Sequence, residues 1–164
     1  MLSDAAKAEL DSILTHYPDK RSALLPALYI AQREYGYLSA EAMREVASSL
    51  ELDPTEVYSV VRFYSLFYSE PVGKYVIHVC EDLPCALRGA EGLIRHLEER
   101  LGIRVGETTP DGLFTLQTAM CLAGCDKAPL MQVNLEYEES LTPGRIDEIL
   151  QRLRNEGIEA KGDE

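Results

Sequence analysis

The sequence has no apolar run long enough to cross a bilayer. Its most apolar stretch, residues 24–31, is less than half of the roughly 20 residues that a transmembrane helix needs, and it contains Pro26. The N-terminal residues MLSDAAKAEL show neither the basic region nor the apolar segment of a secretory signal. We therefore expect no direct membrane insertion, and a cytoplasmic, reducing location.

Basic residues are also few. The chain of 164 residues has 16 Lys and Arg against 28 Asp and Glu, which gives a formal net charge of -12. Nucleic acids and anionic membranes attract basic surfaces, so neither is an expected partner. No G-x-G-x-x-G fingerprint or phosphate loop is present, which argues against a nucleotide site on this chain. A C-x-x-C redox motif is missing as well.

Helical periodicity dominates residues 1–72. Ser3, Ser39 and Asp53 are residue types that cap helix N-termini, and Gly36 is a typical helix stop. We expect four helices, at about residues 3–17, 22–35, 39–50 and 53–67. The predicted N-terminal domain is a helical bundle.

Short apolar, β-rich runs replace this pattern after residue 72. They lie at residues 75–79, 113–117 and 131–135, with one more short strand near Tyr137. A helix to about residue 101 separates the first two, and Thr142-Pro143 begins a last helix. A strand–helix–strand crossover implies a parallel pair, and a close following strand implies an antiparallel one. The predicted fold class is α+β, with a mixed-sheet α/β domain at 73–157 and a flexible tail at 158–164.

Four cysteines stand in two pairs, Cys80-x4-Cys85 and Cys121-x3-Cys125. Each pair directly follows a predicted strand of the parallel pair, so the two loops should lie side by side. Thiolates are soft ligands for iron–sulfur clusters and zinc. Gly124 is expected to supply a left-handed turn around the metal.

Other uses of four cysteines compete with an iron–sulfur cluster. A four-cysteine zinc site, which would make the chain a structural zinc-binding module, usually has tighter C-x2-C spacings. Structural disulfides need an oxidising compartment. A four-iron cluster takes the same four ligands as a two-iron cluster. Spacing and compartment thus favour an iron–sulfur cluster but leave the number of irons open.

The sequence around the cysteines carries further motifs: Pro84-Cys85-Ala86-Leu87-Arg88-Gly89-Ala90, Thr109-Pro110-Asp111-Gly112, Cys121-Leu122-Ala123-Gly124-Cys125, Ala128-Pro129-Leu130-Met131-Gln132-Val133-Asn134 and, in the helical part, Tyr35-Gly36-Tyr37-Leu38. This pattern resembles the thioredoxin-like [2Fe–2S] ferredoxin family. More closely, it is similar to the E-type subunits of bacterial NADH:quinone oxidoreductases (respiratory complex I). Family members often have Gly-Ala or Gly-Ser where this chain has Ala123-Gly124.

The resemblance implies a thioredoxin-like C-terminal domain with one [2Fe–2S] cluster on Cys80, Cys85, Cys121 and Cys125. It implies an electron-transfer subunit of an oxidoreductase, without a complete active site of its own. FMN and NADH would sit on a partner subunit. Other peripheral-arm subunits would complete the assembly, on the cytoplasmic side of the inner membrane. Relatives in NAD-linked hydrogenases and formate dehydrogenases share these motifs, so the host complex stays open.

Charged residues flank the cysteines. Glu81, Asp82 and Asp126 are adjacent to ligands, and carboxylates near an anionic cluster should lower its reduction potential. The alternative is that all three are screened by water. Arg88 and Lys127 are the nearest cations in the sequence.

Several apolar and aromatic residues have expected structural roles. His78 shares a strand face with Cys80 and is expected to be buried rather than a ligand, whereas His96 should face solvent. Met120 and Met131 should fill the core around the cysteine loop. Five aromatic residues are expected in the helical core or, alternatively, against a partner subunit: Tyr58, Phe63, Tyr64, Phe67 and Tyr68.

Overall fold

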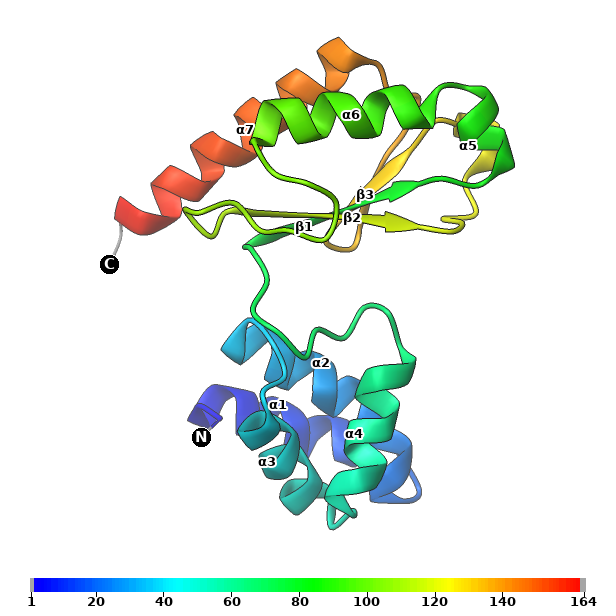
Figure 1. Ribbon diagram of the computed structural model, residues 1–164. Coiled ribbons are helices and arrows are strands. Elements are labelled where there is room, and N and C mark those ends of the chain that lie inside the picture. The colour runs from blue at the N-terminus through cyan, green and yellow to red at the C-terminus, as the bar shows by residue number, and fades with distance from the viewer. Residues whose placement is uncertain (1, 163–164) are drawn as a thin grey trace. The chain divides into compact units, whose positions relative to one another are not determined.

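In a computed structural model, residues 2–162 of the chain are described. The chain divides into two compact units, Met1–Pro71 and Val72–Glu164, shown in Figure 1. Each unit buries a hydrophobic core of its own.

The N-terminal unit consists of helices whose starts follow the predicted caps. They are α1 (Asp4–Leu14), the 3-10 turn η1 (Lys20–Ala23), α2 (Leu24–Tyr35), α3 (Ala40–Leu50) and α4 (Pro54–Phe63). The side chains of Ser3, Ser39 and Asp53 each accept a hydrogen bond from a backbone amide of the first turn, which has no partner within the helix. Gly36 ends α2 with a positive φ of 77°. These four assignments confirm the sequence prediction.

The fourth helix ends at Phe63, earlier than the predicted residue 67. The reason is a competing set of hydrogen bonds from the side chain of Gln32 on α2. Its amide donates to the carbonyl of Leu66 (2.8 Å) and accepts from the amide of Tyr68 (2.8 Å). The segment after Phe63 is thus held against α2 instead of continuing the helix. Phe67 is buried, whereas Tyr58, Phe63 and Tyr64 are exposed.

The C-terminal unit contains a mixed four-stranded sheet. Its strands are β1 (Tyr75–Cys80), β2 (Phe114–Ala119), β3 (Met131–Val133) and β4 (Glu136–Glu138), in the spatial order β2-β1-β3-β4. β1 pairs in parallel with β2 and antiparallel with β3, and β3 pairs antiparallel with β4. The predicted strand directions are confirmed.

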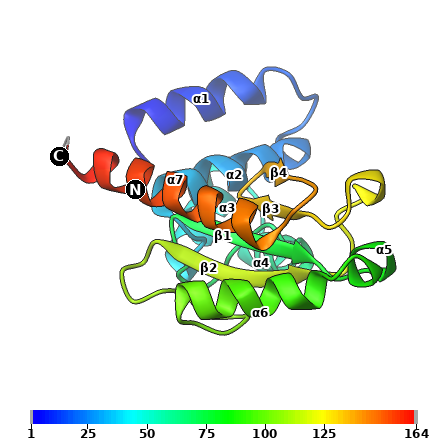
Figure 2. The same ribbon diagram turned by 90° about the horizontal axis from the view of Figure 1, so that it is seen from above.

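Helices α6 (Ala90–Leu101) and α7 (Pro143–Gly162) cover one face of this sheet, as Figures 1 and 2 show. Tyr75, Ile77 and Val79 of β1 point into the core beneath the two helices. The alternating residues of β1 occupy the opposite face, so Cys80 belongs to a separate small buried cluster. Most of the rest of the main core comes from α6, β2, β3 and α7, and the remainder from two loop residues: Leu93, Leu97, Leu101, Ile103, Phe114, Leu116, Met131, Val133, Leu141, Ile146, Ile149, Leu150 and Leu153.

The helix predicted after the first cysteine pair is in fact two helices. The short α5 (Leu83–Leu87) and α6 are separated at Gly89, whose φ is 92°. This break shifts the helical phase. Leu87, which a continuous helix would point inward, is 78% exposed, while Leu93 is buried.

The segment that enters β1 passes very close to β2. The amide of Gly73 donates to the hydroxyl of Thr115 over 2.6 Å. A Cβ atom at position 73 would lie only 2.7 Å from the carbonyl carbon of Phe114. Glycine is therefore required here by close backbone approach.

Helix α7 is the longest helix and runs past the predicted end at residue 157, to Gly162. Thr142 caps it, accepting from the amide of Arg145 (3.2 Å), as predicted. Residues 163–164 of the expected flexible tail lie outside the described residues. Across residues 2–162, no helix combines the length and the apolarity that a bilayer crossing requires.

Helices α6 and α7 are also joined by polar contacts. His96 of α6 does not face solvent as expected. It is half-buried, and its Nε2 lies 2.9 Å from Oδ1 of Asp147 on α7. Nε of Arg100 donates to the same oxygen over 2.7 Å. The hydrogen bond with His96, supported by the charge of Arg100, lowers the pKa of Asp147.

Candidate metal centre

The parallel pairing of β1 and β2 brings the two cysteine loops together, as the sequence predicts. Cys80 is the last residue of β1 and pairs with Ala119, the last residue of β2. The amide of Glu81, one residue further on, donates to the carbonyl of Ala119 over 3.0 Å. Cys85 follows in α5, and Cys121 lies two residues beyond β2.

Each of the four cysteine thiols lies close enough to another of them for their charges to interact. Burial raises the pKa of Cys85 to about 11, and the hydrogen bond with Cys80 and the proximity of Cys80 and Cys125 add to this increase. The charge of Cys125 also contributes to raising the pKa of Cys121. Four thiolates cannot share this space without a compensating positive charge. A bound metal centre would supply it, because thiols that coordinate a metal are deprotonated.

The cysteines form an inner and an outer pair. Cys80 and Cys85 (the inner pair) are buried, whereas Cys121 and Cys125 (the outer pair) are exposed. Among the side chains that the structure describes, residues 2–157, no group of three Cys, His, Asp or Glu could hold a single metal ion. Four cysteine thiols on two adjacent loops are the donor set that a [2Fe–2S] cluster requires.

The outer pair is carried by residues 120–130, here called the outer loop. Its left-handed residue is Ala123, with φ of 60°, and not Gly124 as predicted. Gly124 has a φ of -105° and is needed for another reason. A Cβ atom at position 124 would lie 2.7 Å from Cδ1 of Leu130, a buried neighbour of the inner pair. The Ala123 amide faces the Sγ of Cys121 at 3.4 Å.

Charges surround this site unevenly. Glu81, Asp82 and Asp126 are all exposed, but the Asp82 carboxylate hydrogen-bonds the Cys121 thiol and caps α5 through the Leu83 amide. Asp82 is therefore the flanking carboxylate with a direct contact to a cysteine. The Ala123 amide has the largest single effect on the pKa of Cys121 and lowers it. The Asp82 carboxylate, burial and the neighbouring Cys125 act in the other direction, and together they raise this pKa.

Exposed apolar side chains adjoin the cysteines. Leu83 and Leu87 belong to α5, and Met120 precedes Cys121. Met120 is 77% exposed, so the prediction that it fills the core is wrong, whereas Met131 is fully buried as predicted. We call Leu83, Leu87 and Met120 the apolar rim of the site.

His78 is buried, as expected. Its hydrogen bond is with Gln117 of the neighbouring strand, and burial lowers its pKa. A residue that the sequence did not single out is Tyr137 of β4. Its hydroxyl donates to the carbonyl of Leu122, between the outer cysteines, over 2.9 Å. No spacing or motif pointed to this contact, because it joins segments that meet only through the hairpin of β3 and β4.

Comparison with known proteins agrees with this geometry. A model of the thioredoxin-like [2Fe–2S] ferredoxin family matches residues 10–154. The chain belongs to this family. The resemblance that the cysteine motifs indicated is therefore confirmed, and so is the thioredoxin-like fold of the C-terminal unit.

Family members with similar sequences are subunits of one enzyme. An E-type NADH-quinone oxidoreductase subunit of Rhizobium meliloti is 45% identical over 148 residues, covering 90% of this chain and 88% of the relative. Subunit 2 of the Thermus thermophilus enzyme is 43% identical, covering 88% of this chain and 82% of the relative. The E-type subunit of Mycobacterium tuberculosis H37Rv is 40% identical and covers 92% of this chain, but only 61% of the relative.

A solved structure of an NAD+-reducing [NiFe]-hydrogenase is also similar. Its air-oxidised form superposes with a TM-score of 0.73 at 27% identity, covering 82% of this chain. The present chain spans only 23% of that hydrogenase chain. The ferredoxin-family fold thus occurs there as one part of a longer polypeptide.

Proposed function

We propose that this chain is the [2Fe–2S] electron-transfer subunit of an NADH:quinone oxidoreductase, with Cys80, Cys85, Cys121 and Cys125 as cluster ligands. The observation that carries the proposal is the meeting of two cysteine pairs at the ends of β1 and β2, in a chain of this family. Similarity to the Rhizobium meliloti subunit over nearly the whole length of both chains supports the choice of complex.

The cluster supplies one-electron chemistry, and the chain supplies its surroundings. The inner pair is buried among Ala90, Ala128 and Leu130, which limits access of water. The Ala123 amide at the Cys121 sulfur favours the thiolate. The Asp82 carboxylate next to Cys121 disfavours added negative charge and so lowers the reduction potential.

The proposal assigns FMN and NADH to a partner subunit, so this chain is part of an enzyme without a complete active site of its own. The exposed outer pair and the apolar rim form a surface suited to a partner, since electrons must leave through the exposed side. In the N-terminal unit, Tyr58, Phe63 and Tyr64 offer a second exposed aromatic surface. Further peripheral-arm subunits, on the cytoplasmic side of the membrane, would complete the complex.

A subunit of an NAD-linked hydrogenase is the second candidate. The structural match to the NAD+-reducing [NiFe]-hydrogenase favours it. Sequence identity discriminates between the two, because it is 45% with the Rhizobium meliloti subunit but 27% with the hydrogenase chain. The NADH:quinone oxidoreductase is therefore preferred.

The test compares the isolated chain with the complex purified through a tag on this chain. We expect dithionite, but not NADH, to reduce the cluster in the isolated chain, and NADH to reduce it in the complex. Reduction of the isolated chain by NADH would contradict the assignment of the NADH site to a partner. Reduction of the complex by hydrogen would instead establish the second candidate.

A further inference from the structure

The outer loop has little regular structure of its own. The inner pair is fixed by a strand and a helix, whereas the one regular element that the described chain forms within residues 120–130 is the 3-10 turn η2 (Cys125–Lys127). Internal hydrogen bonds run from Lys127 to Gly124 (3.0 Å) and from Ala128 to Cys125 (3.4 Å). The geometry of the outer pair therefore depends on contacts with neighbouring elements.

Tyr137 of β4 is one such side chain. Its hydroxyl donates to the Leu122 carbonyl over 2.9 Å, at the first residue between the outer cysteines. Leu122 itself packs against the buried cluster that contains Cys80 and Cys85. The tyrosine thus holds the part of the outer loop that links the outer pair to the inner pair.

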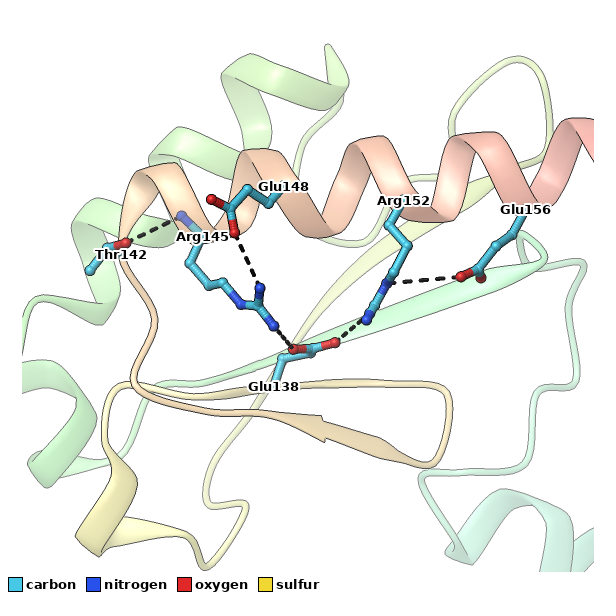
Figure 3. Close-up of polar contacts among 6 residues, drawn as sticks. All are labelled: Glu138, Thr142, Arg145, Glu148, Arg152 and Glu156. Carbon is cyan, nitrogen blue, oxygen red and sulfur yellow. Dashed lines mark hydrogen bonds and ion pairs between the residues drawn. The ribbon is translucent and has the colours of Figure 1, made fainter.

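The strand that carries Tyr137 is firmly anchored. The next residue, Glu138, points to α7, where Arg145 and Arg152 both pair with its carboxylate, as Figure 3 shows. Its side chain is only 14% exposed, so these ion pairs are less screened than those at the surface. Further along, the amides of Ser140 and Leu141 donate to the carbonyls of Lys127 (2.8 Å) and Pro129 (2.9 Å) in the outer loop.

Arg88 makes a comparable contact from the end of α5. Its Nε donates to the carbonyl of Ala128 over 3.2 Å, near the other end of the outer loop. Arg88 lies three residues after Cys85, so it joins the segment of the inner pair to that of the outer pair. It also places a positive charge on the cluster side of the molecule.

We propose that Tyr137 and Arg88 are positioning residues for the cluster: their hydrogen bonds to Leu122 and Ala128 keep the outer pair in ligating geometry. Loss of either bond should loosen one half of the donor set while the inner pair stays intact. Arg88 has a second effect, because its charge stabilises the more negative, reduced cluster. This inference rests on the proposed function, since it presupposes that the four cysteines hold a cluster.

The experiment uses the full chain and two conservative variants, each with a control. Tyr137→Phe removes only the hydroxyl, and Tyr17→Phe removes one from an exposed tyrosine of the N-terminal unit. Arg88→Gln removes the cation, and Arg95→Gln removes an exposed cation paired with Glu91 on α6. The measurements are cluster loss to a chelator, the EPR line width of the reduced cluster, and its midpoint potential.

We expect Tyr137→Phe and Arg88→Gln to lose the cluster about two- to tenfold faster than wild type, which is the range for one hydrogen bond. Both should broaden the EPR lines, because the outer ligands would sample more geometries. Only Arg88→Gln should also lower the midpoint potential. The two control variants should match wild type in all three measurements.

The outcomes separate this inference from the proposed function. A wild-type chain that holds no [2Fe–2S] cluster would defeat the proposed function before any variant is compared. A wild-type chain with a cluster, together with a Tyr137→Phe variant equal to Tyr17→Phe in release rate and line width, would overturn the inference for Tyr137. An unchanged release rate in Arg88→Gln would do the same for Arg88.

Discussion

The two residues between the outer cysteines offer a sharp test of the site geometry. Ala123 occupies the left-handed region with φ of 60°. This conformation costs a non-glycine residue about 1–2 kcal/mol. Ala123→Gly removes that cost. Glycine also makes the unfolded chain more flexible, which lowers the free energy of unfolding by about 0.4–1 kcal/mol. We expect a net stabilisation of the outer loop of about 0.5–1 kcal/mol.

The neighbouring substitution should act in the opposite direction. A Cβ atom in Gly124→Ala would lie 2.7 Å from Cδ1 of Leu130, which is 1% exposed and packed beside the inner pair. Leu130 must shift within a packed cluster, and overpacking of this kind typically costs about 1–3 kcal/mol. Alanine also restricts the unfolded chain more than glycine does, and the stability gained in this way offsets only part of that cost.

The assay is the half-life of the visible absorption of the cluster-loaded chain in a chelator with moderate urea. Ala123→Gly should lengthen the half-life about two- to fivefold, and Gly124→Ala should shorten it by at least as much. Gly92→Ala, in the first half of α6 with open space around it, is the control for a general gain in fold stability, because alanine stabilises a helix interior relative to glycine. Only a change in half-life beyond that of Gly92→Ala is attributed to the loop. A shorter half-life for Ala123→Gly, or an unchanged one for Gly124→Ala, would refute the described loop geometry.

Three further predictions concern other parts of the C-terminal unit. Gly73→Ala should destabilise the fold by about 2–4 kcal/mol in urea unfolding, because its Cβ would lie 2.7 Å from the backbone of Phe114. A change below about 1 kcal/mol would show that residue 73 does not approach β2 so closely. Asp82→Asn should raise the midpoint potential of the cluster by about 30–60 mV, because asparagine lacks the negative charge next to Cys121. Asparagine caps α5 equally well, so the helix should be unaffected. An unchanged potential would mean that water screens this carboxylate. The lowered pKa of Asp147 stabilises the fold above its usual pKa of 3.8, and this contribution is lost as pH falls through the lower folded value. The melting temperature of Asp147→Asn should therefore lie below that of wild type at pH 6, and the difference should close on acidification; a constant difference would argue against the bond with His96.

Much of the fold was predictable because local signals agree with the tertiary structure. Ser3, Ser39 and Asp53 cap helices for the same local reason that predicts them as caps. The crossover rule predicted the parallel pairing of β1 and β2, and this pairing brings the two cysteine loops together. The order of the strands was therefore sufficient to predict that the two cysteine loops meet.

The wrong predictions have tertiary causes. Helix α4 stops at Phe63 because Gln32, distant in the sequence, bonds the segment that follows. Met120 is apolar and therefore resembles a core residue, but the sequence does not show that its loop leaves the sheet edge toward solvent. Propensity assigns the left-handed position to glycine, whereas contact with Leu130 decides where glycine is needed.

The tyrosine contact to the outer loop shows the same limit of sequence analysis. Tyr137 stands on a strand of three residues, and its partner Leu122 precedes it by fifteen positions. A single sequence carries no local pattern for such a contact. It becomes visible only when the hairpin of β3 and β4 is placed next to the outer loop.

The central claim is that the four cysteines hold a [2Fe–2S] cluster that carries electrons. The most direct test is the EPR spectrum of the anaerobically purified chain after dithionite reduction, with iron, sulfide and zinc analysed on the same sample. We predict a spin-one-half signal with two irons and two sulfides per chain. An EPR-silent sample with stoichiometric zinc would contradict the claim and make the site structural.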